Sequence, residues 1–171
     1  MIRCLGTACF ILLNLACLRG PAHVPVPTQA PLREDVVDLD GIMKAFYDVV
    51  NVAPDGPRQW GRDRTLYSPW IRFVGIGHEV DIWDHQRLVD ETEPMVRAGF
   101  REREIHRVTH RYGNIATVLS TYETESGPEH TLSRGVNSLQ LYHDGRRWWI
   151  ASVTWQSETK EHPIPVELLK P

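Results

Sequence analysis

The sequence predicts an α+β domain, because helical periodicity and strand-like runs occupy different halves of the chain. Apolar residues recur at helical spacing from Val36 to Val50, whereas the chain after Gly99 is rich in β-branched and aromatic residues. Tyr112-Gly113 and Asp144-Gly145 are tight-turn signals between the β-rich runs and favour antiparallel hairpins. Helices followed by a meander of long strands indicate α+β rather than a parallel α/β sheet.

The predicted elements follow in order. We expect an amphipathic helix over 36–51, a short helix over 58–67, a strand over 71–74 and a third helix, capped by Asp84, that runs to about Ala98. Pro94 falls inside the third helix and predicts a kink or two short helices there. The remaining strands are expected at 104–111, 114–123, 132–142 and 147–156.

The first 22 residues resemble an export signal. Arg3 supplies an early positive charge, an apolar run covers 4–18, and Gly20-Pro21-Ala22 offers the small residues typical of a cleavage site. We therefore expect a signal peptide over 1–22 and an exported protein, periplasmic or secreted. Two alternatives stay open: lipidation of Cys17, which would leave the protein lipid-anchored, and an uncleaved N-terminal anchor.

The rest of the chain divides into a Pro-rich leader at 23–34, a folded domain at 35–159 and a C-terminal tail at 160–171. Removal of 22 of the 171 residues leaves 149, with 17 basic and 22 acidic residues, no cysteine and a net charge of −5. An acidic domain with scattered arginines is not expected to bind nucleic acid. Contact with a membrane is expected only through an uncleaved signal or a lipidated Cys17.

The last predicted hairpin carries three of the six tryptophans. A two-residue loop at Asp144-Gly145 would pair His143 with Arg146, so that Trp148, Ile150 and Ser152 share one strand face with Asn137, and a different loop length would shift this pairing. We assign that face to the core, with Asn137 and Ser152 at the mouth of a pocket or simply bonded to each other. The opposite face would then hold an apolar patch of Val136, Trp149, Ala151, Val153 and Trp155.

Such a patch is rarely left to water in a monomer, so we predict a homodimer joined sheet to sheet through these five residues. Thr117, Leu119 and Thr121 would extend the patch on the neighbouring strand. The alternative is that the C-terminal tail folds back over it.

Several stretches together resemble one superfamily. FYDVV, LYSPWIRFV, GFRERE, GNIATVLSTYE and RGVNSLQLYHDGRRWWIASVTWQSE are similar to segments of the nuclear transport factor 2-like, or SnoaL-like, superfamily, in an uncharacterised subgroup. The resemblance implies a cystatin-like cone: a curved antiparallel sheet of four to six strands wrapped around an N-terminal helix, with two short helices and an enclosed cavity. Its members include ketosteroid isomerases, scytalone dehydratase, polyketide cyclases and non-catalytic binding domains, so the fold implies a pocket without choosing the chemistry.

Combined, these observations predict a protein that binds a small apolar metabolite, or isomerises, dehydrates or cyclises it, without metal or organic cofactor. His106 and Tyr47 are the candidate acid–base residues. The expected pocket lining is Tyr47, Trp60, His106, Tyr122, Asn137 and Ser152. The alternative is a non-catalytic exported binding or interaction module that uses its outer sheet face.

Metal binding is not favoured at either histidine-containing segment. His106 and His110 would lie about 13 Å apart on a strand, too far to share one ion. The segment 78–85 combines two histidines with acidic residues that could hold a divalent ion. The favoured interpretation is a polar loop in which Asp84 caps the next helix.

Overall fold

The computed structural model describes residues 22–51, 53, 56–127 and 129–170. Its helices are α1 (Arg33–Val36), α2 (Leu39–Asp48), α3 (Trp60–Arg64), α4 (His85–Arg97) and the short 3-10 helix η1 (Val166–Leu168). Its strands are β1 (Tyr67–Ile76), β2 (Val80–Trp83), β3 (Phe100–Tyr112), β4 (Ile115–Ser126), β5 (Thr131–His143) and β6 (Trp148–Ser157). The predicted signal peptide, with Cys17, lies outside the described residues except for Ala22.

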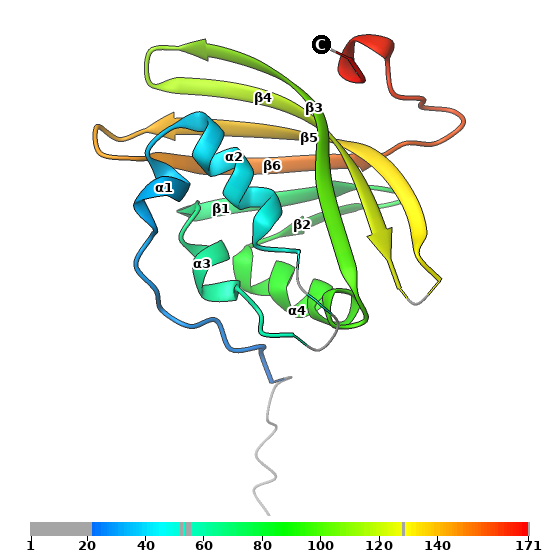
Figure 1. Cartoon of the computed structure of the whole chain (residues 1–171), viewed down its shortest axis with the longest axis horizontal. Coiled ribbons are helices and arrows are strands. Elements are labelled where there is room, and N and C mark those ends of the chain that lie inside the picture. Colours follow the sequence, from blue (N-terminus) through cyan, green and yellow to red (C-terminus); the bar gives the residue numbers. More distant parts are fainter. Residues whose placement is uncertain (1–21, 52, 54–55, 128, 171) are drawn as a thin grey trace, which may run out of the picture.

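The six strands form one curved sheet in the order β2-β1-β6-β5-β4-β3. All neighbours are antiparallel except β1 and β6, which run parallel. Figure 1 shows the sheet curving around α2, with α3 and α4 at the lower opening of the cone. The predicted α+β cone is confirmed, with β2 as a strand where the sequence favoured a polar loop.

The predicted first helix is two helices. Asp38 has extended backbone and its carboxylate accepts the Gly41 N–H at 2.7 Å, so it caps α2 and separates it from α1. A Cβ on Gly41 would lie 2.1 Å from the Glu34 carbonyl, so the close approach of α1 to α2 requires glycine here. Ile42 and Met43 of α2 are fully buried against the sheet.

The predicted second helix is shorter than expected, and the third has the predicted extent. α3 ends at Arg64, and Tyr67 already belongs to β1. Asp84 caps α4, as predicted, by accepting the Arg87 N–H at 2.9 Å. The sequence predicted a kink or two short helices at Pro94; α4 runs unbroken past it, so the division into two helices is wrong, and Pro94 is exposed.

The β5–β6 connection is two residues longer than predicted. His143 pairs with Trp148, and Leu141 pairs with Ile150. A shift of two residues keeps each side chain on its predicted face, because side chains alternate with a period of two. Trp148 and Ile150 are therefore buried in the core, with exposed fractions of 2% and 0%.

A β-bulge then reverses the faces along the rest of β6. The register shifts between Leu141 and Gln140, which pairs with Ser152, leaving Ala151 as the extra residue. Beyond this point Val153 pairs with Leu139 and Trp155 with Asn137, all on the inner face. The prediction that Val153 and Trp155 lie on the outer face is therefore wrong, and so is the prediction that Ser152 faces the cavity.

The outer face of the sheet is partly covered and partly open. The C-terminal segment returns to β3 and β4, where the Thr121 hydroxyl donates to the Leu168 carbonyl (Figure 1, red). Towards the hairpin ends the outer face is aromatic: Trp70 is 60% exposed and stacks on Tyr142 at 6.0 Å between ring centroids. The tail thus covers one part of this face and leaves the aromatic part open.

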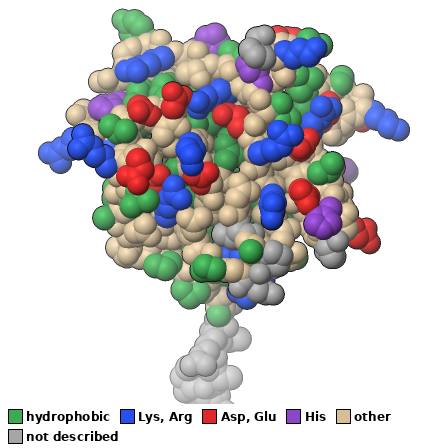
Figure 2. All heavy atoms as spheres, viewed as in Figure 1, with side chains coloured by type: hydrophobic (Ala, Val, Ile, Leu, Met, Phe, Trp, Pro, Cys, Tyr) green, Lys and Arg blue, Asp and Glu red, His purple; other side chains and the backbone are tan. Residues whose placement is uncertain are grey.

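The surface seen in Figure 2 intersperses basic and acidic side chains without a large patch of one sign. In the described part of the chain, no helix is long and apolar enough to cross a membrane.

Candidate functional site

The cone encloses a cavity of about 440 Å³ between the inner sheet face and the helices α2, α3 and α4. Most of its lining is apolar or aromatic, and its polar residues come from β3, β4, β5 and β6 and from α3 and α4. Three residues expected in the pocket line it: Trp60, Tyr122 and Asn137. Further lining residues are Phe46, Val50, Phe73, Trp83, Leu88, Met95, Val96, Phe100, Val153 and Trp155.

Glu102 is the acid that β3 places inside this cavity. It pairs with Thr124 on β4, and both side chains belong to the cavity lining. Burial raises the pKa of the Glu102 carboxyl to about 7, and the hydrogen bond from Asn137 acts in the opposite direction. The side chain is only partly buried because it borders the open space of the cavity.

A hydrogen-bond chain leads from Glu102 through the core to a second carboxyl. Asn137 Nδ2 lies 3.3 Å from both Glu102 Oε1 and the Tyr47 hydroxyl oxygen, and donates to them. Tyr47 lies 2.6 Å from Ser120 Oγ, which donates to Glu104 Oε1 at 2.6 Å. Since Ser120 uses its proton towards Glu104, Tyr47 donates to Ser120.

This arrangement changes the expected role of Tyr47. Burial, followed by the charge of Glu102, raises the pKa of the phenol, so Tyr47 stays protonated. It does not line the cavity but lies behind Asn137, where it fixes the amide that bonds Glu102. Tyr47 therefore bonds Asn137 from outside the cavity and does not line the pocket as the sequence predicted.

A second buried cluster lies where α3, β1 and α4 meet. Asp63 is 1% exposed; its Oδ2 lies 2.7 Å from His85 Nε2, and its Oδ1 accepts the Tyr67 hydroxyl at 2.8 Å. Burial, reinforced by the Asp63 charge, raises the pKa of Tyr67. Asp63 and Tyr67 border the cone cavity, whereas Tyr67 and His85 border a separate groove outside it. The cluster forms a polar wall between the two spaces.

His106 does not face the cone. The register of β3 and β4 shifts between Glu104 and His106, and His106 pairs with Thr121 on the outer face, where the C-terminal segment returns. The predictions of His106 as a pocket residue and as a base are therefore wrong. No group of three or more His, Cys, Asp or Glu side chains is placed to hold a metal ion in the described ranges.

Glu102 and the Asp63–His85 pair were not anticipated from the sequence. In the segment 101–107, charges alternate as they do on a solvated strand, and nothing local marks one of them as buried. Asp63 and His85 are 22 residues apart and meet only because α3 and α4 pack at the same end of the sheet. No apolar stretch surrounds Asp63 in the sequence, so nothing local predicted that this acid would be buried.

The comparisons with known proteins reveal similarity in structure only. No family model and no curated protein sequence matches the chain. A protein of unknown function with a cystatin-like fold from Nostoc punctiforme superimposes with a TM-score of 0.59 at 8% identity, covering 72% of this chain and 91% of that one. A ketosteroid isomerase-like protein from Erwinia carotovora atroseptica gives 0.53 at 12% identity, covering 75% and 99%.

An NTF2-like protein of unknown function from Shewanella baltica gives a TM-score of 0.51 at 12% identity, covering 70% of this chain and 90% of that one. At identities this low, the structural similarity establishes the arrangement of the helices and strands, whereas the chemistry has to be inferred from the site itself. The chain has the cystatin-like cone fold of the nuclear transport factor 2-like, or SnoaL-like, proteins.

Proposed function

We propose that this protein binds a small apolar molecule inside the cone. In this proposal Glu102 removes a proton from one atom of that molecule and delivers it to another, in an isomerisation or a loss of water. The observation that carries this proposal is the Glu102 carboxyl, with its raised pKa and its bond from Asn137, in a mainly apolar cavity of about 440 Å³ that Asp63 and Glu91 also line. Such a cavity is large enough for a small ring system and excludes most of the water that would compete for the carboxyl.

The chemistry follows from the pKa of Glu102. A carboxyl with a pKa of about 7 is partly ionised at neutral pH, so it can accept a proton from carbon and return it to the same molecule. Asn137 bonds one carboxyl oxygen of Glu102, and Glu102 lines the cavity. Tyr47, Ser120 and Glu104 keep Asn137 in place and do not contact the substrate.

The test uses nitrobenzisoxazole, an apolar probe that opens to a coloured cyanonitrophenolate when a base removes its ring proton. We expect wild-type protein to accelerate this reaction, and Glu102→Gln to lower kcat/KM by about 100-fold or more, since Gln cannot accept the proton. The matched control is Glu79→Gln, at an exposed glutamate between β1 and β2. An unchanged rate in Glu102→Gln would refute the proposed base.

The pH profile provides a second test of the same group. The base must be ionised, so kcat/KM should rise with pH and level off above a pKa of about 7. A profile that levels off near the ordinary carboxyl value would mean that the reacting acid is exposed to solvent, not Glu102.

A second candidate function is a non-catalytic interaction module. The open outer face of the sheet supports it. Trp70 and Ile115 are each 60% exposed there, next to Tyr142 and Trp149. We propose that a second copy of the chain covers this aromatic area in a homodimer. Light scattering should then show a dimer for wild type and a monomer for Trp149→Glu; a monomeric wild type at tens of micromolar contradicts it.

We also propose export, on the sequence of residues 1–22. Mass spectrometry of the protein from its native host should find a chain beginning near His23, or a lipid on Cys17. An unprocessed chain with Met1 would contradict this proposal.

A further inference from the structure

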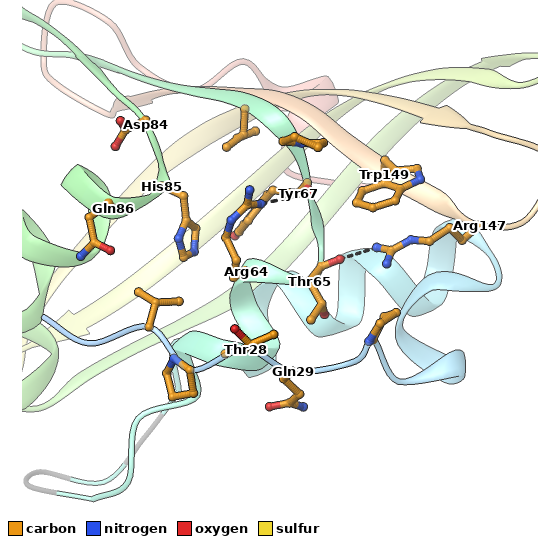
Figure 3. Close-up of a pocket in the computed structure, with 16 residues that line it drawn as sticks. Thr28, Gln29, Arg64, Thr65, Tyr67, Asp84, His85, Gln86, Arg147 and Trp149 are labelled. Carbon is orange, nitrogen blue, oxygen red and sulfur yellow. Dashed lines mark hydrogen bonds between the residues drawn. The ribbon is translucent and has the colours of Figure 1, made fainter.

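A groove of about 620 Å³ lies outside the cone, on the far side of the Asp63–His85 pair. One wall is the Pro-rich leader at 26–31, and the other is formed by α3, the start of β1 and the start of α4. Figure 3 shows Arg64 and His85 entering it from one side and Arg147 and Trp149 from the other. The proposed function above makes no use of this space.

Two guanidinium groups border the groove without a carboxylate partner. Arg64 Nη1 donates to the Tyr67 carbonyl at 3.2 Å; Arg147 donates to the Trp148 carbonyl at 3.1 Å and to the Thr65 carbonyl. Neither forms an ion pair with any described residue. Other arginines of the chain do, such as Arg62 with Asp35, at 2.7 Å.

The acids near the groove are already engaged. Asp84 caps α4, and Asp63 is shared between His85 and Tyr67. Asp144 accepts the Trp149 indole N–H at 2.8 Å and two backbone N–H groups, and acts on Arg147 only through its charge. The groove is therefore lined by more positive than negative charge, in a place partly shielded from water.

Trp149 holds Arg147 in a fixed orientation. The Arg147 guanidinium carbon lies 3.7 Å from the centre of the indole ring, and the indole N–H is tied to Asp144. Stacking leaves the edge of the guanidinium accessible; its Nε and Nη2 donate to the Trp148 and Thr65 carbonyls, and Nη1, which bonds none of the described residues, is left to bind an anion. Val26, Pro27, Pro31 and Ile71 supply the apolar surface beside it.

The leader wall is held in place by specific contacts. Asp90 accepts the Val24 N–H at 2.8 Å and bonds His23 at 2.6 Å, and Gln86 donates to the Val24 carbonyl at 2.9 Å. A Cβ on Gly61 would lie 2.8 Å from the Pro27 carbonyl, so the leader packs directly on α3. The groove is thus preformed, which lowers the entropic cost of binding.

We propose that this groove is a second binding site, separate from the cone, for a small organic carboxylate whose body is an aromatic ring. Arg64 and Arg147 bind the carboxylate, and the ring lies against the prolines of the leader. Two guanidiniums without a carboxylate partner among the described residues, a fixed aromatic platform and an apolar wall together carry this assignment.

The test is calorimetric titration of the full chain with naphthoate and with naphthalenemethanol, its uncharged counterpart. Naphthoate should bind at least 10-fold more tightly, and Arg64→Gln and Arg147→Gln should each weaken it about 10-fold, a typical effect of losing one charge-assisted bond. The matched control is Arg72→Gln, because Arg72 also donates only to backbone carbonyls but lies outside the groove. Circular dichroism confirms that each variant is folded.

Binding in the cone is distinguished by Leu88→Trp, which fills the other cavity. Naphthoate affinity should survive this change. The proposal is overturned if naphthoate fails to bind, if naphthalenemethanol binds equally well, if the two arginine variants behave like Arg72→Gln, or if Leu88→Trp abolishes binding. None of these outcomes bears on Glu102, whose test is the rate with nitrobenzisoxazole.

Discussion

The cone cavity and the outer groove lie on opposite sides of one polar wall and differ in the charge they present. The cone offers the carboxyls of Glu102, Asp63 and Glu91, and none of the arginines that the structure describes lines it. The groove is lined by the guanidiniums of Arg64 and Arg147 and the imidazole of His85, and Asp84 is its acidic residue. Tyr67 borders both spaces, so the two ligand environments are separated by little more than one layer of side chains.

This difference shows how burial acts on acids and on arginines. Burial raises the pKa of the Glu102 carboxyl to about 7, so that at neutral pH its protonated and ionised forms are about equally populated. Burial also lowers the pKa of Arg147, but a guanidinium begins so far above neutrality that it stays charged. The cone is therefore suited to moving a proton, and the groove to holding an anion.

The largest effect is expected at the wall itself. Asp63→Ala leaves the Tyr67 hydroxyl and His85 Nε2 buried without their partner, which should lower the free energy of unfolding by about 3 kcal/mol in urea denaturation. Asp63→Asn keeps one acceptor oxygen and should cost about half as much. The exposed Asp81→Ala is the control, and a loss below about 1 kcal/mol in Asp63→Ala would mean that water replaces the carboxylate.

A change confined to the cone is Gly135→Ala. The added Cβ would lie 2.2 Å from the Tyr122 hydroxyl and 2.5 Å from the backbone carbonyl of Gln156, so β5 and β6 must shift. We expect a loss of about 2–3 kcal/mol in the free energy of unfolding. The affinity for naphthoate should be unchanged, and a parallel loss of that affinity would show that the two spaces are coupled.

The raised pKa of Glu102 should appear in the pH dependence of stability. Between about pH 4.5 and pH 7 the folded protein retains a proton that the unfolded chain has released, so the free energy of unfolding falls as pH rises. We expect a fall of about 1–2 kcal/mol, less than the full pKa difference implies because the carboxyl borders a cavity that admits water. Glu102→Gln should remove this part of the slope; an identical slope in both proteins would contradict the assignment.

The smallest effect is expected in the groove. Gly61→Ala places a Cβ 2.8 Å from the Pro27 carbonyl, and the leader must move away from α3. The free energy of unfolding should fall by about 1 kcal/mol and naphthoate should bind a few-fold more weakly. The rate with nitrobenzisoxazole should stay constant, since Gly61 does not line the cone. A slower rate would show that the position of the leader affects the reaction in the cone.

The sequence predicted the elements better than it predicted the faces of the strands. Turn signals at Gly113 and Gly145 and the β-branched and aromatic composition of the last four strands were enough to predict the meander. β2 was missed because Val80–Trp83 is short, mostly exposed and flanked by acids. Three of the six expected pocket residues line the cavity; His106 and Ser152 do not, because each follows a register shift.

The sequence by itself determined the class of fold, since periodicity, helix caps and tight turns are local and act before any long-range contact forms. The tertiary structure decided which side chains face the cavity. One bulge at Ala151 turned Val153 and Trp155 inward, and only pairing with β5 reveals it. The curvature of β3 over the helices placed one glutamate of an alternating charged run inside the cone, because burial depends on what the rest of the chain brings opposite it.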